Sequence, residues 1–363
     1  MGRAICDLAW LRPDAHNVRM SKTASDQTAG SALMSFRPFC DESDYARMLE
    51  ILHESSRADH DDWTPSLDEI RAWCAPTARF DPARQLVFAS MAGTADGAEP
   101  LGVSRVSWYT GANDACIYAQ TSFLLPEWRQ PGVWPALVRE GDRQIREMAA
   151  GHPSLSERYS QGWATESQTQ WIAALKAEGY EAVRHFHNMV RTLDAVPALA
   201  IAPSPDELEV RPVQADHMRR IWEAQAEVNQ ELFEYVAEQW TEARYPGWLA
   251  DTSHTPRLWQ VAWDGDQVAG MVLARIDDVA NRGRERKRGY TEHVFVRRPW
   301  RGRGLAKALL VRSLRLLKED GMEEAELGVD SENDSGAFGF YLRLEYVAER
   351  TDIWLRKPLD AGQ

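Results

Sequence analysis

Long apolar segments are absent from this chain of 363 residues. A helix that crosses a bilayer needs about 20 consecutive apolar residues. The longest apolar stretch, residues 305–317, is interrupted by three basic residues, Lys307, Arg312 and Arg315. The sequence therefore predicts no membrane-spanning helix.

Cysteine is scarce, and the four cysteines form neither a Cys-x-x-Cys pair nor a regular spacing: Cys6, Cys40, Cys74 and Cys116. This usage predicts no zinc site and no disulfide framework, and it is typical of the reducing cytoplasm. The uninterrupted apolar segment of a secretory signal is missing from residues 1–33. We expect these residues to form a loose extension, with Met20 and Met34 as alternative start sites.

Basic residues are outnumbered, with 42 Lys and Arg against 55 Asp and Glu and a formal net charge of −13. This charge repels a phosphate backbone and makes nucleic acid an unsuitable general partner. The negative net charge either attracts a cationic small molecule or serves solubility alone, and both interpretations stay open.

The remaining composition, 44% hydrophobic and 27% charged, is typical of a soluble globular protein. The length is about twice that of a usual domain of ~100–200 residues, which favours two domains. Residues 193–207 contain three prolines and no amphipathic period, as in a linker. We therefore expect four segments: a loose extension 1–33, a first domain 34–194, a linker 195–207 and a second domain 208–363.

Three landmarks recur in the same order in both halves, 174, 172 and 166 residues apart: Arg37-Pro38 with Arg211-Pro212, Arg129 with Arg301, and Gly179-Tyr180 with Glu345-Tyr346. Each half also closes on a strand-like segment, residues 187–193 and 352–355. The common order and nearly constant spacing predict a tandem duplication of one α/β unit.

In the second half, the periodicities predict strands and helices in this order: strand 209–212, helix 216–228, hairpin strands 258–263 and 268–276, strand 292–296, helix 304–319, strand 324–329, helix 336–344 and strand 352–355. Asp264-Gly265 is a favoured tight-turn pair, and Gly321 ends the long helix. Hairpins followed by βα units predict an α/β (α+β) fold with a mixed sheet flanked by helices.

The segment with the clearest chemistry is a strand, a basic turn and a helix start in direct succession, residues 294–306. Gly302 and Gly304 allow consecutive backbone N–H groups to turn toward an oxyanion, and the helix dipole adds positive potential there. Arg301 and Arg303 would add charge-assisted hydrogen bonds. The alternative is a glycine turn with a solvated basic face.

The pattern Arg301-x-x-Gly304-x-Ala306 resembles motif A of the GCN5-related N-acetyltransferase (GNAT) superfamily. The resemblance implies that the turn, with Gly302, Arg303 and Leu305, holds the pyrophosphate of acetyl-coenzyme A (acetyl-CoA). It also implies that the backbone of Phe295 and Val296 pairs with the pantetheine amides.

A second stretch, residues 333–346, is similar to the following motif of this family, an Asn and then a helix that bears a Tyr. Here Glu345-Tyr346 stands where Gly-Phe is usual. The resemblance implies two tandem GNAT-like domains, each with a mixed, mostly antiparallel central sheet flanked by helices. On one helix, Asn333 and Tyr341 would be about two turns apart, so that both face the pantetheine arm.

Acetyl transfer to an amine requires a base and an acid. The amine, with an ordinary pKa of about 10.4, must lose a proton before it attacks, and the departing thiolate must gain one. Tyr341 is the candidate acid. Glu292 is the candidate base, since strand alternation places it on the face of Val294 and Val296, whereas His293 points to the opposite face and is expected to be structural.

The first half lacks several of the residues that form the oxyanion turn and supply the candidate acid in the second half. Its turn carries Pro131, which has no N–H, and the bulky Trp134. Leu175 stands at the position that corresponds to Tyr341. We expect a degenerate GNAT-like domain that shapes the acceptor cleft or stabilises the active half, a layout similar to other tandem GNAT proteins.

Two further features are open. The basic run 282–288 is either a solvated loop or a contact for the adenosine phosphate or an acidic acyl carrier protein. Most tryptophans are expected in the core, with Trp240 and Trp248 as candidates for an acceptor pocket.

The resemblance implies an acetyl-CoA-dependent N-acetyltransferase that acts on a small-molecule amine by direct attack in a ternary complex, with acetyl-CoA as cosubstrate and without a metal. One alternative uses a longer acyl-CoA or an acyl-carrier-protein thioester. Another is a nonenzymatic acyl-CoA sensor or interaction module. No nucleic acid or membrane partner is expected.

Overall fold

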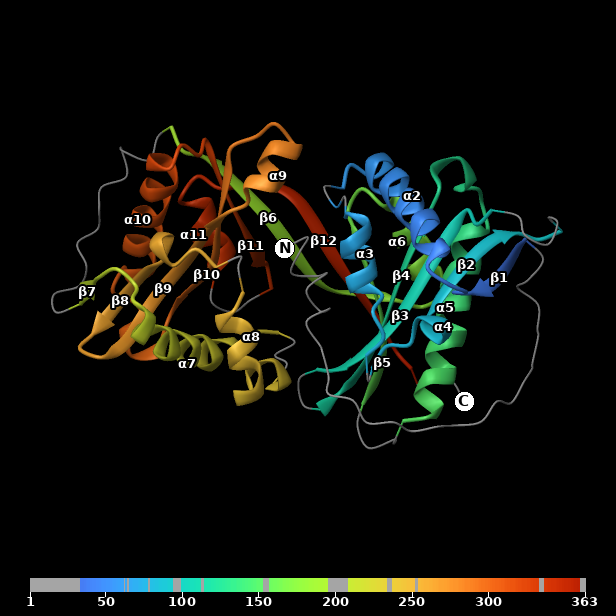
Figure 1. Ribbon diagram of the computed structural model, residues 1–363, viewed down its shortest axis with the longest axis horizontal. Helices are drawn as coiled ribbons and strands as arrows, with labels where there is room; N and C mark the ends of the chain where they lie inside the picture. The colour runs from blue at the N-terminus through green and yellow to red at the C-terminus, as the bar shows by residue number, and fades with distance from the viewer. Residues whose placement is uncertain are drawn as a thin grey trace. The chain divides into compact units, whose positions relative to one another are not determined.

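The computed structural model describes residues 33–61, 63, 65–77, 79–93, 99–111, 114–152, 157–194, 208–233, 237–251, 254–332 and 336–359. The predicted linker and nearly all of the predicted N-terminal extension lie outside these residues. The chain divides into two compact units (Figure 1). Unit 1 comprises Met1–His185 and Thr351–Gln363, and unit 2 comprises Phe186–Arg350.

Unit 1 is built on a sheet with the strand order β1-β2-β3-β4-β5-β12. Only β4 and β5 run parallel among its strand pairs of the described residues. The strands are β1 (Met34–Pro38), β2 (Leu86–Met91), β3 (Gly102–Thr110), β4 (Cys116–Leu124), β5 (Arg158–Thr165) and β12 (Val347–Pro358). The helices are α2 (Ser43–Ala58), α3 (Leu67–Trp73), α4 (Pro82–Gln85), α5 (Val133–Ala150) and α6 (Thr169–Ala177).

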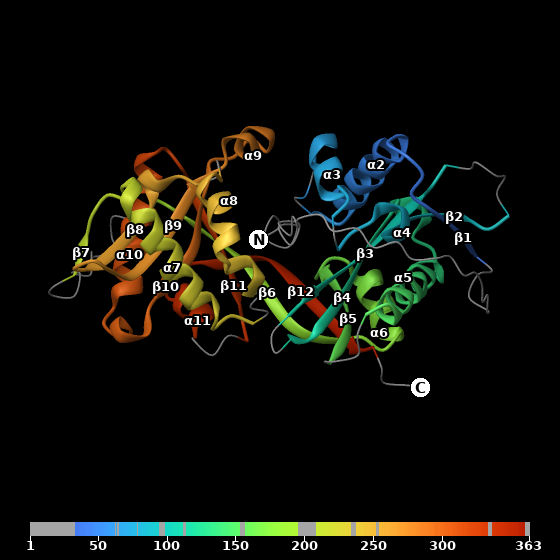
Figure 2. The same ribbon diagram turned by 60° about the horizontal axis from the view of Figure 1, so that its bottom comes forward.

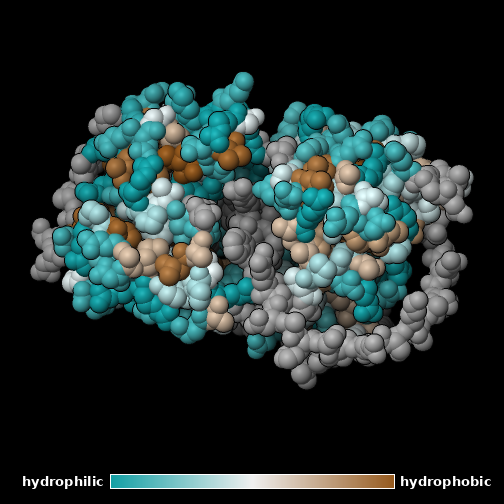
Figure 3. Space-filling model, viewed as in Figure 1, coloured by the Kyte–Doolittle hydropathy of each residue, from teal (hydrophilic) through white to brown (hydrophobic). Residues whose placement is uncertain are grey.

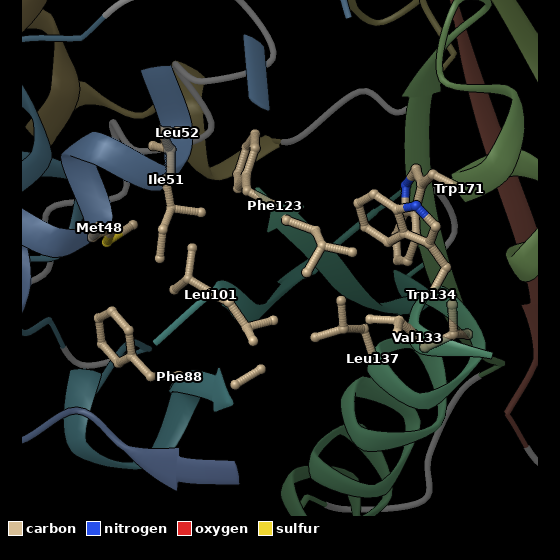
Figure 4. Packing of buried hydrophobic residues seen from close by; sticks show 14 of the residues in the cluster. Met48, Ile51, Leu52, Phe88, Leu101, Phe123, Val133, Trp134, Leu137 and Trp171 are labelled. Carbon is tan, nitrogen blue, oxygen red and sulfur yellow. The ribbon is translucent and has the colours of Figure 1, made fainter. Parts of the chain in front are cut away.

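Helices cover both faces of the unit 1 sheet. Figure 2 shows α2 and α3 on one side of this sheet and α5 and α6 on the other. Buried residues of α2 and α5 recur at helical spacing, so that each helix presents one apolar stripe to the sheet. In Figure 4, Met48, Ile51 and Leu52 from α2 and Leu137 from α5 contribute to this core, and Trp134 lies beside Trp171. The centroids of these two indole rings are 5.2 Å apart.

Unit 2 repeats the architecture with the strand order β6-β11-β10-β9-β8-β7. Its strands are β6 (Glu181–Thr192), β7 (Glu209–Val210), β8 (Gln260–Asp264), β9 (Gln267–Ile276), β10 (Arg288–Val296) and β11 (Glu324–Asp330). Its helices are α7 (Met218–Asn229), α8 (Tyr245–Leu249), α9 (Asp278–Gly283), α10 (Leu305–Glu319) and α11 (Ala337–Leu342). Here β10 and β11 are the parallel pair.

Two hydrophobic clusters cover the opposite faces of the unit 2 sheet. Alternate residues of β9 divide between them: Val272 packs with α10, whereas Met271 and Leu273 pack with α7. We call these the α10 face and the α7 face. The predicted fold, two tandem units with a mixed, mostly antiparallel sheet flanked by helices, is confirmed.

The closing strands are exchanged between the two halves of the sequence. In β12, Asp352–Pro358 pair with Tyr159–Thr165 of unit 1. In β6, Phe186–Thr192 pair with Glu324–Asp330 of unit 2. The sequence analysis assigned each closing strand to its own half, and the two units instead divide within β6 and β12.

On the surface drawn in Figure 3, hydrophilic residues predominate on both units. Among the described helices, none combines the length and the apolar character that a bilayer crossing requires. The three described cysteines, Cys40, Cys74 and Cys116, are free thiols.

The strand exchange predicts that unit 1 depends on the end of the chain. Deletion of Thr351–Gln363 removes most of the strand that pairs with β5, including the buried Trp354 and Leu355. Burial of each such side chain contributes about 1.5–3 kcal/mol, so we expect unit 1 to lose at least ~3 kcal/mol of its free energy of unfolding. Hydrogen exchange of β5 amides, measured by mass spectrometry, reports this loss directly.

A chain that ends at Leu359 retains the whole of β12 and is the matched control. If β5 is equally protected in both truncated chains, the exchanged strand does not stabilise unit 1.

Candidate functional site

The turn between β10 and α10 leaves several backbone donors unused. Gly302 and Gly304 have φ values of +76° and +79°, and a Cβ atom at either position would meet no atom within 4 Å. Gly304 is the N-cap of α10 and supplies no side-chain cap. The backbone N–H groups of residues 302–307 donate no hydrogen bond to any described residue. An oxyanion is the ligand that such a helix start binds best.

Two arginines flank these donors. Arg301 donates from Nε to the Val296 carbonyl at 2.8 Å and from Nη1 to Glu231 at 3.0 Å. Arg298 binds the same carboxylate at 2.9 Å, and the hydrogen bond from Arg301 is the largest cause that lowers the pKa of Glu231. Arg303 is exposed and makes no side-chain hydrogen bond to any described residue. The turn therefore offers positive charge to an incoming anion.

The strand before the turn separates from its parallel neighbour. Pairing of β10 with β11 covers only Arg288, Gly289 and Tyr290, after which β11 continues along β6. Among the described residues, the edge of β10 that bears Phe295 and Val296 therefore has no strand partner on the β11 side. An extended amide-containing arm could add to this free edge as a strand does.

A β-bulge lies on the same strand. Glu292 is opposite Leu273, but the next paired residue of β10 is Phe295, opposite Met271. The extra residue gives His293 a φ of +47° and re-aims the side chains around it.

Because of the bulge, the predicted orientation of Glu292 is wrong. Directly paired residues point to the same face, so Glu292 shares the α7 face with Leu273 and Phe295. Val294 and Val296 pack with the α10 face instead. The simple two-residue alternation had placed Glu292 with these valines, and one inserted residue reverses the assignment.

The carboxylate of Glu292 is held by a largely buried arginine, Arg275. Arg275 Nε lies 2.9 Å from Glu292 Oε1, and its guanidinium stacks 4.3 Å above the ring centroid of Tyr290. The Glu292 side chain remains 39% exposed. Part of the His293 side chain is exposed to solvent. The protein atoms around its ring exclude water and lower its pKa, whereas the negative charge of Glu292 raises it.

His254 was missed in the sequence analysis. It lies between the rings of Trp248 and Trp259, at centroid distances of 4.8 and 5.2 Å. Its Nδ1 is buried and has no hydrogen-bond partner among the described residues. Burial lowers the pKa of His254, while Asp251 and Glu292 act in the opposite direction. The result is a neutral imidazole near Glu292; only the folded chain brings the two residues together.

The tryptophans near His254 form an aromatic cluster. Trp222 is buried and lies 4.6 Å from Trp240 and 5.3 Å from Trp248 between ring centroids. Trp240 and Trp248 remain partly exposed. Their predicted role in an acceptor pocket stays a prediction.

Tyr341 approaches from the α10 face. Its side chain is buried, and its ring lies 5.8 Å from that of Tyr346 in an edge-on contact. Burial raises the pKa of the phenol far above its usual range, so the hydroxyl is protonated and can donate. It makes no hydrogen bond to any described residue. The candidate acid and the candidate bases thus lie on opposite faces of the sheet.

The predicted pairing of Asn333 with Tyr341 on one helix stays a prediction. The helix that bears Tyr341, α11, begins at Ala337 behind an N-cap Gly336 with φ +67°. Asn333 itself lies outside the described residues.

The basic run 282–288 is largely engaged within unit 2. Arg288 is buried and binds three carboxylates, Glu324, Glu326 and Glu349, at 2.6–3.0 Å. Lys287 binds Glu323 at 2.8 Å. Arg288 also starts β10, about 26 Å from its other end at ~3.3 Å per residue. This separation argues against the run as a contact for phosphates held at the turn.

The corresponding turn of unit 1 makes different contacts. Arg129 binds Asp59 at 2.5 Å and is only 16% exposed, so it ties the turn to α2. Pro131 lacks an N–H, and a Cβ at Gly132 would lie 2.9 Å from Leu33. Leu175 is fully buried, and pairing of β3 with β4 is continuous without a bulge. Among the described residues, unit 1 therefore offers fewer free donors at this turn, and it has neither the acid nor the bulge of unit 2.

The left-handed turn predicts a specific cost for Gly304→Ala. Since no atom would clash, the whole effect is backbone strain, about 1–2 kcal/mol of the free energy of unfolding in urea. Gly247→Ala within α8, which also has open space but no positive φ, is the control and should be neutral or stabilising. Equal stability of the Gly304→Ala variant and the original chain would contradict the assigned conformation.

Comparison with known proteins is consistent with this geometry. The Acetyltransferase (GNAT) family matches residues 218–346, which lie within unit 2. The N-alpha-acetyltransferase MAK3 of Arabidopsis thaliana is 32% identical over 107 residues, 29% of this chain and 54% of that protein. The match thus spans about half the length of this relative. The Mycothiol acetyltransferase of Catenulispora acidiphila is 29% identical over 244 residues, 63% of this chain and 69% of that protein.

Solved structures extend the likeness to both units. A GCN5-related N-acetyltransferase from Sphaerobacter thermophilus has a TM-score of 0.67 at 24% identity and covers 91% of this chain and 97% of its own. A tandem GNAT protein from the clavulanic acid biosynthesis pathway has a TM-score of 0.60 at 14% identity, over 91% of this chain and 100% of its own. Residues 218–346 of unit 2 therefore match the Acetyltransferase (GNAT) family, and the two units together share the fold of tandem GNAT proteins.

Proposed function

We propose that unit 2 transfers the acetyl group of acetyl-CoA to the amine of a small molecule. The observation that carries this proposal is the set of unpartnered N–H groups at 302–307, placed at the end of a strand with a free edge. GNAT proteins generally use acetyl-CoA, and this arrangement suits its pyrophosphate and its extended arm.

In the proposed complex, Gly302–Ala306 donate to the pyrophosphate, and Arg301 and Arg303 supply charge. Arg301 would exchange its ion pair with Glu231 for the phosphate. Phe295 and Val296 hold the pantetheine amides along the free edge of β10. The thioester then lies in the opening between β10 and β11.

The chemistry proceeds by direct attack. The neutral amine nitrogen forms a bond to the thioester carbon while the carbon–sulfur bond breaks, and the amine proton passes to a base on the α7 face. His254, with its buried and unpartnered Nδ1, and Glu292 are the candidates for this base. Tyr341, from the α10 face, gives a proton or hydrogen bond to the departing thiolate. No described cluster of His, Cys, Asp or Glu is arranged to hold a metal ion.

The direct test is a screen of an amine library for thiol release from acetyl-CoA. A double variant, Arg301→Ala with Arg303→Ala, should raise the KM for acetyl-CoA about tenfold or more, since each charged hydrogen bond contributes ~1.5–3 kcal/mol. Arg139→Gln, which removes an exposed charge from α5, is the control. Activity unaffected by the double variant would remove the pyrophosphate assignment.

The acid role predicts a selective effect of Tyr341→Phe. This substitution keeps the ring packing and removes only the hydroxyl, so kcat should fall about 10²-fold or more while the KM for acetyl-CoA is retained. Tyr346→Phe is the matched control, because its hydroxyl makes only a long 3.4 Å contact with Thr291. Equal kcat values for the two variants would rule out Tyr341 as the acid.

The base role predicts a pH profile. Burial lowers the pKa of His254 below its ordinary 6.5, and only the neutral ring accepts a proton. We therefore expect kcat/KM to be constant near pH 7 and to fall as the pH drops through this lowered pKa. His254→Gln should abolish this acid limb. A limb that persists in His254→Gln and disappears in Glu292→Gln would assign the base to Glu292.

A further inference from the structure

Unit 1 contains a cavity that the acetyl-transfer site does not use. Its volume is about 90 Å³. Five of the 15 tryptophans of the chain line it, together with two arginines and smaller residues: Trp63, Ala72, Trp73, Ala75, Thr77, Arg79, Phe80, Arg105, Ser107, Trp108, Tyr109, Ala119, Thr121, Phe123, Gln161, Trp163 and Trp354. All these residues belong to unit 1.

The strands build the floor of this cavity. Arg105, Ala119 and Gln161 come from β3, β4 and β5, and each alternates with residues that face α5. The cavity thus lies on the face that α3 covers with Trp73. At one edge of the cavity, Trp108 also packs against the cluster that contains Ile145 and Ala149 of α5, far along that helix from the turn at its start.

The polar groups of the floor are already ordered. Trp163 Nε1 donates to Thr121 Oγ1 at 3.0 Å. Gln161 donates to Tyr109 Oη at 3.1 Å and accepts from Arg356 at 2.7 Å. A ligand would therefore enter a preformed cavity, which lowers the entropic cost of binding.

The arginines give the cavity its charge. The Arg105 guanidinium carbon lies 4.1 Å from the ring centroid of Phe80 and 4.7 Å from that of Trp73. The guanidinium carbon of Arg79 lies 4.6 Å from the Trp108 centroid. Stacking on the aromatic rings fixes the orientation of each guanidinium group. Each group has five N–H donors, so it can donate to a protein partner and to a ligand at the same time.

The sign of this charge decides between two kinds of ligand. Aromatic walls alone suit a quaternary ammonium ion. Here, however, cations already occupy the ring faces of Trp73, Phe80 and Trp108, and no acidic side chain is among the described lining residues. In a chain of net charge −13, this cavity is a local concentration of positive charge.

We infer that this cavity binds a small monocarboxylate with a flat apolar body. The carboxylate would lie against Arg79 and Arg105, and the apolar body against Trp163 and Trp354. The volume is below the ~150 Å³ of an engineered cavity that binds benzene, which limits the body to about the size of a five-membered ring. This site is independent of the acetyl transfer proposed for unit 2.

Furan-2-carboxylate is the probe, followed by tryptophan fluorescence and by calorimetry on the full chain. We expect saturable binding with a Kd on the order of 1 mM or tighter. The neutral furan-2-carboxamide and the cationic furfurylamine should bind at least ~10-fold more weakly. Equal or tighter binding of either analogue would overturn the assignment of a carboxylate site.

Two variants locate the binding. Ala119→Leu fills the floor without removing a charge or a hydrogen bond, and Arg79→Gln removes one cation; each should weaken furan-2-carboxylate binding at least ~10-fold. Arg139→Gln on α5 and the Arg301→Ala, Arg303→Ala double variant should bind as the original chain does. Unchanged affinity in Ala119→Leu, with the fold intact by circular dichroism, would overturn the proposal even if Arg79→Gln fails to fold.

Discussion

The start of α10 is the constraint on which the rest of unit 2 depends. A helix leaves its first N–H groups without internal partners, and side-chain caps, water or ligands satisfy them. Here the N-cap is a left-handed glycine, and the donors at 302–307 remain open. Arg301 and Arg303 would repel a cation at this turn, so an anion is its natural ligand. The separation of β10 from β11 then gives the arm attached to that anion a path into the sheet.

The two units show how one architecture can keep or lose this property. In unit 1 the corresponding arginine is committed to Asp59, and a proline replaces one donor. These changes tie the arginine to α2 and reduce the number of donors that the turn can offer to an oxyanion. Unit 1 keeps its sheet, its covering helices and a charged aromatic cavity on the α3 face. The duplication has therefore left two units with the same fold and different surface chemistry.

Local sequence patterns predicted most elements and the turn. The hairpin across Asp264-Gly265, the helix that starts after Gly304 and the strand at 324 all occur close to their predicted bounds. These features depend on turn chemistry and periodicity, which are local. The resemblance supplied the family, which the comparisons support.

Features that depend on tertiary structure were not predictable from the sequence. The exchange of β6 and β12 follows from long-range strand pairing that no local pattern records. The bulge at His293 inserts one residue and reverses the face of Glu292. His254 stands in no motif, and only folding places it between two tryptophans near Glu292.

Amide hydrogen exchange of the full chain with and without coenzyme A tests the central claim most directly. Binding at the start of α10 should slow the exchange of the Gly302–Ala306 amides, because these donors gain acceptors on the pyrophosphate. The amides of 132–134 and 136 in unit 1 should exchange at unchanged rates. Protection of the unit 1 segment, or none at 302–306 when calorimetry shows that coenzyme A is bound, would contradict the account.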